Sequence, residues 1–232
     1  MTRSRTARTS APLIMAVLSL MVFTTRAEAQ IGLRGGMNLS KFVGGDAPNS
    51  ETTKRLNAGG SFSLIHIGPV SLVPEVYYSQ KGARELASTL TNPGTTPVPT
   101  GGTTVFGLDY IEIPVLAKIS FPLARLLNGY VTGGPAYAWN VDCSIQVTDA
   151  GATPPSNDCS QTFGSFKSAM QKADLGAVAG LGLDFRIPNL GGLNLDARLV
   201  RGLRTLTTGT AGTDIKNQTV SLMLGYYLGA PR

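Results

Sequence analysis

The chain has 232 residues and a formal net charge of +6, and 15% of its residues are charged, against about 25% in an ordinary globular domain. Four arginines and one glutamate lie within the first 29 residues, so residues 30–232 carry only +3. The basic residues of this part are scattered along the sequence, which argues against a nucleic-acid-binding protein, because such proteins gather them on one face.

The first 29 residues form a separate unit. Three arginines precede an apolar run from Leu13 to Phe23, and the unit ends at Ala27-Glu28-Ala29. This pattern is typical of a secretory signal peptide with an A-x-A cleavage site, and the run is too short to span a membrane as a helix. We therefore expect a signal peptide over residues 1–29 and a single mature domain over residues 30–232.

The mature sequence divides into eight segments in which apolar side chains recur at every second position, the period of a β-strand. The fourth segment is the clearest, because apolar residues from Ile111 to Ile119 share one face while Tyr110, Glu112 and Lys118 share the other. In chain order the segments are 31–39, 59–66, 71–79, 110–119, 131–141, 174–186, 193–199 and 219–228.

The connections between these segments alternate in length. Long connections rich in Gly, Ser, Thr, Asn and Pro cover residues 40–56, 82–104, 142–172 and 205–216. Short ones lie at Gly68-Pro69, from Pro122 to Asn128 and from Pro188 to Gly192. Bacterial outer-membrane barrels have long extracellular loops and short periplasmic turns. The sequence therefore predicts an all-β fold: a closed antiparallel transmembrane β-barrel of about eight strands with up-and-down topology.

The orientation of the two strand faces decides between a membrane protein and a soluble one. With the apolar face turned to lipid, the glycines and small polar residues fill the narrow interior that eight strands leave. Closing the ring also gives every backbone N–H and C=O group of the strands a hydrogen-bond partner, which the hydrocarbon core of a membrane requires because it contains no water. Charges inside must then be paired, because an unpaired buried charge is costly. We expect a lumen ion network of Arg34, Glu75, Glu112, Lys118, Asp184, Arg186, Asp196 and Arg198.

The two cysteines, Cys143 and Cys159, fall in one long polar connection of an exported protein. A disulfide that closes this loop is the natural interpretation. A metal site is not expected, because the single histidine, His66, lies far from them in the sequence. No cofactor is expected either.

Several stretches carry a family resemblance. Residues 73–83 (VPEVYYSQKGA), 110–118 (YIEIPVLAK) and 32–40 (GLRGGMNLS) resemble the PorT-like outer-membrane β-barrel family, often called the porin family, and Gly133-Gly134-Pro135 is similar too. The resemblance spans the mature chain and implies an eight-stranded barrel in the outer membrane, without a defined activity. Pro74 and Pro114, which each remove a ladder donor, fall inside these motifs.

The resulting hypothesis is a non-enzymatic barrel in the cell outer membrane. Its narrow, polar-filled lumen leaves a structural, adhesive or small-solute role, exerted through the long loops. The expected partners are outer-membrane lipid and the barrel-assembly machinery, with no nucleic acid and an unknown partner at the loops. Two alternatives stay open: a soluble secreted lipid-binding barrel of lipocalin type, and a lipid hydrolase that uses His66.

Individual side chains have competing interpretations. His66 is expected on the lipid-facing side beside the Gly68-Pro69 turn, with an interfacial role. Glu75 and Glu112 could form the carboxylate pair of a glycoside hydrolase, but a structural pairing with Lys118, Arg34 or Arg198 is preferred. Aromatic residues near strand ends suit girdles at the two membrane interfaces; they are Phe42, Tyr130, Trp139, Tyr226 and Tyr227.

Overall fold

The computed structural model describes residues 30–47, 50–86, 103–148, 157–158, 171–206 and 214–228, and the descriptions below refer to these. All regular secondary structure in the described residues is β-strand. No helix in the described part of the chain is long and apolar enough to cross a membrane. The predicted signal peptide, residues 1–29, lies outside these ranges.

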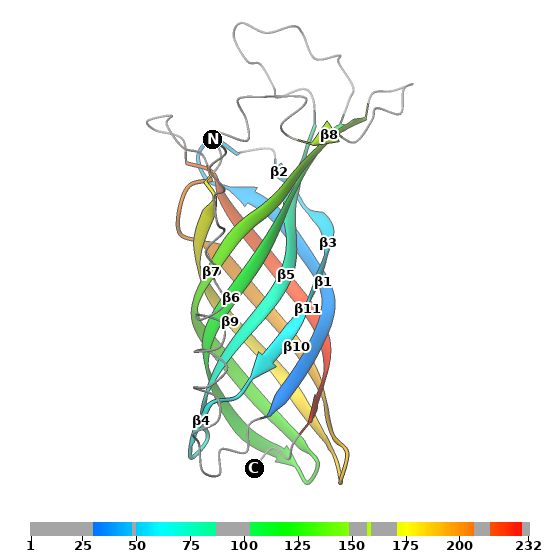
Figure 1. Cartoon of the computed structure of the whole chain (residues 1–232), viewed down its shortest axis with the longest axis vertical. Coiled ribbons are helices and arrows are strands. Elements are labelled where there is room, and N and C mark those ends of the chain that lie inside the picture. The colour runs from blue at the N-terminus through cyan, green and yellow to red at the C-terminus, as the bar shows by residue number, and fades with distance from the viewer. Residues whose placement is uncertain are drawn as a thin grey trace, which may run out of the picture.

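Eight long strands form one closed ring (Figure 1). Every neighbouring pair is antiparallel, and each strand lies beside the next one in the chain. Strand β1 pairs with β11 and so closes the ring. The long strands are β1 (Ile31–Val43), β3 (Thr53–Phe62), β5 (Val70–Leu86), β6 (Thr103–Ala124), β7 (Leu127–Thr148), β9 (Ala173–Ile187), β10 (Gly191–Gly202) and β11 (Lys216–Leu228); β2 (Ser50–Glu51), β4 (Ile65–Ile67) and β8 (Asn157–Asp158) are short.

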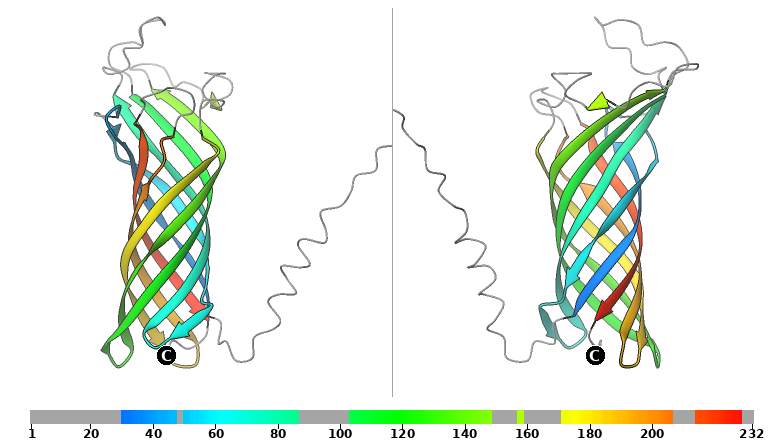
Figure 2. Two further views of the ribbon diagram at one scale, coloured as in Figure 1. Left: turned by 90° about the vertical axis from the view of Figure 1, so that its left-hand side faces the viewer. Right: turned by 45° about the vertical axis from the view of Figure 1, so that its right-hand side comes forward.

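The predicted eight-stranded up-and-down barrel is confirmed, and the short turns lie where they were expected. The predicted boundaries of the long loops are wrong, most of all on one side; β1 and β3 also extend into the expected loop 40–56. Strands β5, β6 and β7 have 17, 22 and 22 residues, so they extend into the expected loops 82–104 and 142–172. Pairing of β6 with both neighbours extends to Thr103, with a register shift between Asp109 and Tyr110 on the β7 side, and sustains these strands. This side of the barrel therefore rises above the other (Figure 2).

The apolar face of the strands points outward, as predicted. Leu33 and Leu181, for example, are 70% and 63% exposed, whereas Asn38 and Glu75 are fully or almost fully buried. A band of this size is far larger than the apolar patches of soluble monomers. The alternative of a soluble lipocalin-like barrel is therefore wrong, because such a protein turns its apolar face inward.

The predicted aromatic girdle is only partly correct. Trp139 and Tyr226 face outward, but Phe42, Tyr130 and Tyr227 are buried inside. Parity explains the difference, since these three residues share a strand face with inward polar residues such as Ser40. An aromatic residue near a strand end can belong to a girdle only if it occupies one of the outward-facing positions of the strand.

Candidate functional site: the barrel lumen

Four charged side chains cross the middle of the lumen, and we call them the central charge layer: Arg34 of β1, Glu75 of β5, and Asp196 and Arg198 of β10. Arg34 Nη1 lies 2.7 Å from Glu75 Oε1 and 3.9 Å from Asp196 Oδ2. Arg198 donates through Nε to Asp196 Oδ1 at 2.5 Å and through both Nη atoms to Glu75. Two cations thus meet two carboxylates, and each side chain is at most 8% exposed.

Two further ion pairs lie on either side of this layer. Toward the short turns, Lys118 Nζ lies 2.5 Å from Asp184 Oδ2, and Asn194 Nδ2 donates to Asp184 Oδ1 at 2.7 Å. Toward the long loops, Lys81 Nζ lies 2.6 Å from Glu112 Oε2. The lumen therefore carries three layers of ion pairs, with Asp174 as a further buried carboxylate on the loop side.

Lys81 was missed by the sequence prediction, although a signal for it exists. It has the same strand parity as Glu75, Tyr77 and Ser79, which all point inward. The prediction ended its third segment at residue 79, so Lys81 fell outside it. Continuing the alternation of the third segment by two residues, from Ser79 to Lys81, would have predicted that the Lys81 side chain points into the lumen.

Tyrosines fill the space between the charges. Tyr130 donates from its hydroxyl to Asp196 Oδ2 at 2.5 Å, and its ring lies 4.1 Å below the Lys118 ammonium. The Tyr77 ring lies beside Arg198, and the Tyr110 ring beside Lys81. Such cation–π contacts and hydrogen bonds offset part of the cost of burying these ions, although Asp174 Oδ1 and the Tyr77 hydroxyl have no hydrogen-bond partner among the described residues.

The lumen on the side of the long loops is packed with apolar side chains. The most completely buried large members of this cluster are Leu108 and Tyr110, each 1% exposed. It also contains Phe42, Ala47, Ala83, Ala138, Cys143, Ile145 and Leu206. The interior is therefore most highly charged near the middle of the barrel and more apolar on the loop side.

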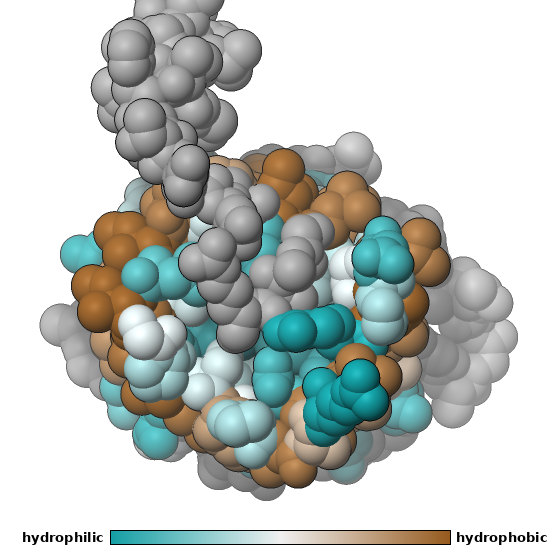
Figure 3. Space-filling model, turned by 90° about the horizontal axis from the view of Figure 1, so that it is seen from below, coloured by the Kyte–Doolittle hydropathy of each residue, from teal (hydrophilic) through white to brown (hydrophobic). Residues whose placement is uncertain are grey.

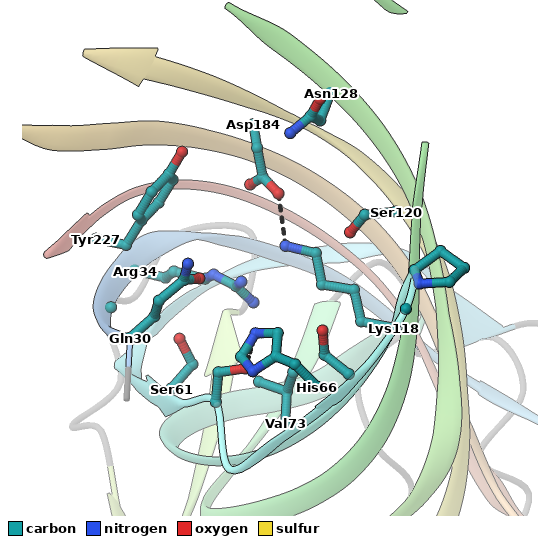
Figure 4. Close-up of a pocket in the computed structure, with 15 residues that line it drawn as sticks. Gln30, Arg34, Ser61, His66, Val73, Lys118, Ser120, Asn128, Asp184 and Tyr227 are labelled. Atoms are coloured by element: carbon teal, nitrogen blue, oxygen red, sulfur yellow. Dashed lines mark hydrogen bonds and ion pairs between the residues drawn. The ribbon is translucent and has the colours of Figure 1, made fainter. Parts of the chain in front are cut away.

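A cavity of about 340 Å³ opens at the end with the short turns. Figure 3, viewed from this end, shows hydrophilic residues inside the ring and hydrophobic ones around it. Figure 4 shows Arg34, Lys118 and Asp184 at the cavity with Ser61 and Ser120. The lining thus combines hydroxyl and amide groups with an ion pair that is already satisfied.

The expected position of His66 is wrong. Leu64 and Ile65 are both exposed although they are consecutive, so the alternation shifts by one residue between β3 and β4. His66 consequently lines the cavity, where its Nε2 lies 3.1 Å from Ser63 Oγ (Figure 4). In the described part of the chain no carboxylate is hydrogen-bonded to His66, so a Ser-His-acid triad has no third member there.

The other predicted residues are placed as follows. Glu75 and Glu112 take part in separate ion pairs, which is the structural pairing that was preferred over a hydrolase pair, with Lys81 in place of the expected partners for Glu112. Arg186 lies half-exposed near the end of β9, away from the central charge layer. Cys143 is buried in the apolar cluster, and Cys159 lies outside the described residues. In the described ranges no three His, Cys, Asp or Glu side chains form a group that could hold a metal.

Comparison with known proteins agrees with this architecture. A family model described as outer membrane protein beta-barrel domain matches residues 19–208. No curated protein sequence matches the chain significantly.

Several solved structures are similar in fold. Neisserial surface protein A has 11% identity and a TM-score of 0.46, covering 86% of this chain and 97% of that one. Outer membrane protein W of E. coli has 14% identity and a TM-score of 0.45, with 88% and 100% covered. Ail, the attachment invasion locus protein of Yersinia pestis, has 12% identity and a TM-score of 0.37, with 86% and 99% covered.

Proposed function

Since the chain belongs to the family of outer-membrane proteins with a β-barrel domain, we propose that it is a non-enzymatic, non-conducting barrel that holds its long extracellular loops as a contact surface. The central charge layer is the observation that carries this proposal. It links β1, β5 and β10 across the lumen through buried ion pairs. The apolar cluster lies beyond it on the loop side.

Removing one charge from such a layer would destabilise the folded barrel by several kcal/mol, because the opposite charge would remain buried without a partner. The layer therefore acts as a fixed plug rather than a gate. Ions that enter the cavity from the side of the short turns meet Arg34 at its inner end. A barrel of this kind contributes a stable wall and a platform for loops.

Conductance in planar lipid bilayers tests the plug. The purified protein is expected to give no channel steps. The double variant Glu75→Ala with Arg198→Ala removes one charge of each sign from the layer and is expected to give rare, small steps, because the apolar cluster still restricts the loop side of the lumen. The matched control, Asp214→Ala with Lys216→Ala, removes an ion pair outside the lumen and should stay silent. Steps from the unaltered protein would refute the proposal.

The contact role belongs to the side of the barrel where β5, β6 and β7 rise (Figure 2). Cells that express the full protein are expected to adhere or aggregate more than cells that express a variant with residues 87–102 replaced by a short Gly-Ser turn. Heat-modifiable gel migration checks that both barrels fold. Equal adhesion of the two strains, with equal surface amounts, would contradict a contact role of this loop.

A second candidate function is the binding of a small polar solute at the cavity. Its volume of about 340 Å³ and its hydroxyl-rich lining favour a neutral polyhydroxylated molecule. Titration calorimetry with hexoses, compared between the native protein and His66→Leu, tests this function. Absence of heat with every hexose at millimolar concentration would remove it.

We further propose that Cys143 and Cys159 form a disulfide. Ser144 and Asp158, the residues next to them in the sequence, are paired across β7 and β8. Faster migration of the protein on a non-reducing gel than on a reducing one, abolished in Cys159→Ser, is the expected result. Identical migration would exclude the bond.

Export is proposed to follow from the signal peptide over residues 1–29, with insertion by the barrel-assembly machinery. The finer assignment to the PorT-like branch rests on the motifs at 73–83 and 110–118 and stays a prediction. N-terminal sequencing of protein from the outer membrane is expected to begin at Gln30. A mature protein that begins at Met1 would contradict the signal peptide.

A further inference from the structure

Three basic residues lie together on the outer face near the extracellular ends of four adjacent strands. Lys41 of β1 and Arg201 of β10 both pair with Gln218 of β11, so the three form one row across the sheet. Lys54 of β3 pairs with Leu39, the preceding outward residue of β1. We call Lys41, Lys54 and Arg201 the basic rim.

The basic rim borders directly on the apolar band. The row below it consists of Leu39, Val220 and Leu199, which are registered with one another. Val220 and Leu199 are 39% and 43% exposed, as lipid-facing residues are. The cations therefore lie at the depth where hydrocarbon gives way to headgroups, the depth at which long basic side chains extend toward the interface.

Within the described residues the basic rim forms no ion pair, and only Arg201 lies near enough to a carboxylate, Asp214, to interact with it electrostatically. Asp214, an acidic residue near these strand ends, is paired with Lys216 at 2.5 Å. A phosphate at this depth would thus meet available ammonium and guanidinium donors, the groups that bind it best.

The opposite wall ends differently. Where the apolar band of β5, β6 and β7 stops, Tyr78 and Gln80 donate to the Asp109 carboxylate, and Trp139 is exposed beside them. Asp142 follows on the same side. At its extracellular boundary the outer circumference therefore carries the basic rim on one side and Trp139 with two aspartates on the other, where Arg84 of β5 lies further toward the loops.

We propose that the basic rim binds the phosphate groups of outer-leaflet glycolipid, so that phosphorylated lipid is held on the side of β3, β1, β11 and β10. This surface is independent of the plugged lumen and of the loop contact role. It requires only that the barrel is folded in its membrane orientation, with the short turns in the periplasm.

Native mass spectrometry of the purified barrel in nonionic detergent tests the proposal. The probe is an equimolar mixture of bisphosphorylated lipid A and the same lipid with its phosphates removed. The native protein is expected to retain the phosphorylated form preferentially. The variant with Lys41→Gln, Lys54→Gln and Arg201→Gln is expected to retain about a hundredfold less, since each cation near an anionic surface contributes about fivefold.

A matched control removes the same charge elsewhere on the exposed surface, by Arg84→Gln, Arg125→Gln and Lys172→Gln. This control should retain phosphorylated lipid as the native protein does. Heat-modifiable migration verifies that both triple variants fold. Equal retention by the basic-rim variant and the native protein, equal retention of the two lipids, or the same loss in the control would each overturn the proposal.

Discussion

The two faces of each strand obey opposite rules although they alternate residue by residue. On β10, Leu195 and Leu199 face lipid and have no polar partner to satisfy, whereas Asp196 and Arg198 between them are almost fully buried and paired. The outer face is tolerant of shape and intolerant of charge. The inner face tolerates charge only as a complete set, so single changes there should cost most.

The largest effect is expected from Glu75→Gln. This change leaves Arg34 and Arg198 without their shared carboxylate, and breaking a buried pair typically costs about 3–5 kcal/mol. The free energy of unfolding, measured by urea titration in lipid vesicles, should fall by that amount. Gln80→Ala on the same strand, which is half-exposed, serves as the control. A loss below about 1 kcal/mol would show that the layer is not a cooperative unit.

The next effect is expected on the outer face. Leu195→Arg places a cation among Leu183 and Leu224, its registered neighbours. A lipid-facing arginine near the membrane midplane destabilises a barrel by about 2–4 kcal/mol. Leu195→Met is the control with a similar volume. If the same titration shows no difference between the two variants, this face does not lie in hydrocarbon.

A smaller effect is expected from Tyr130→Phe. The change removes a hydroxyl that donates to Asp196 and accepts from Asn194, and an unsatisfied buried partner costs about 1–3 kcal/mol. Tyr137→Phe is the matched control, because Tyr137 is on the same strand and faces outward. Equal stability of the two variants would mean that the Tyr130 hydroxyl does not stabilise the layer.

The smallest effect is expected from Lys216→Ala at the extracellular end. Its hydrogen bond to Asp214 lowers the pKa of that carboxyl, so any stabilisation is present above the ordinary pKa of an aspartate and is lost as the pH falls through the lowered one. Exposed pairs of this kind contribute little. No change outside the error of the titration is expected at neutral pH. A clear decrease in the free energy of unfolding would show that this exposed ion pair stabilises the protein as much as the buried pairs do.

Strand number, alternation and most of the inward charges could be predicted from the sequence, because parity and loop length determine them; Lys81 was missed, and Arg186 lies away from the central charge layer. The partners of the charges could not be predicted. Glu75 contacts residues of β1 and β10, which lie far away in the sequence and meet it only across the closed ring. Local pattern carries no information on which strands face each other across the lumen.

Two predictions were wrong because of strand parity: one where the inward–outward alternation shifts by a residue, and one where the alternation was not used. The extra residue between β3 and β4 moved His66 from the lipid-facing side to the cavity. The tyrosines were assigned by composition and position rather than by face, and Tyr130 proved to be a lumen residue. A tyrosine suits either a membrane interface or a polar interior. Only its position in the inward–outward alternation of the strand tells which of these two locations it occupies.

The seam between the first and last strands has a consequence for biogenesis. Every residue of β1 is paired with β11, from Ile31 with Leu228 to Val43 with Lys216. Until the final strand has been synthesised and delivered, β1 presents a bare row of amide and carbonyl groups, a template on which other chains could polymerise. Because β11 is the only described strand that pairs with this edge of β1, the ring can close only after the last segment of the chain has been synthesised.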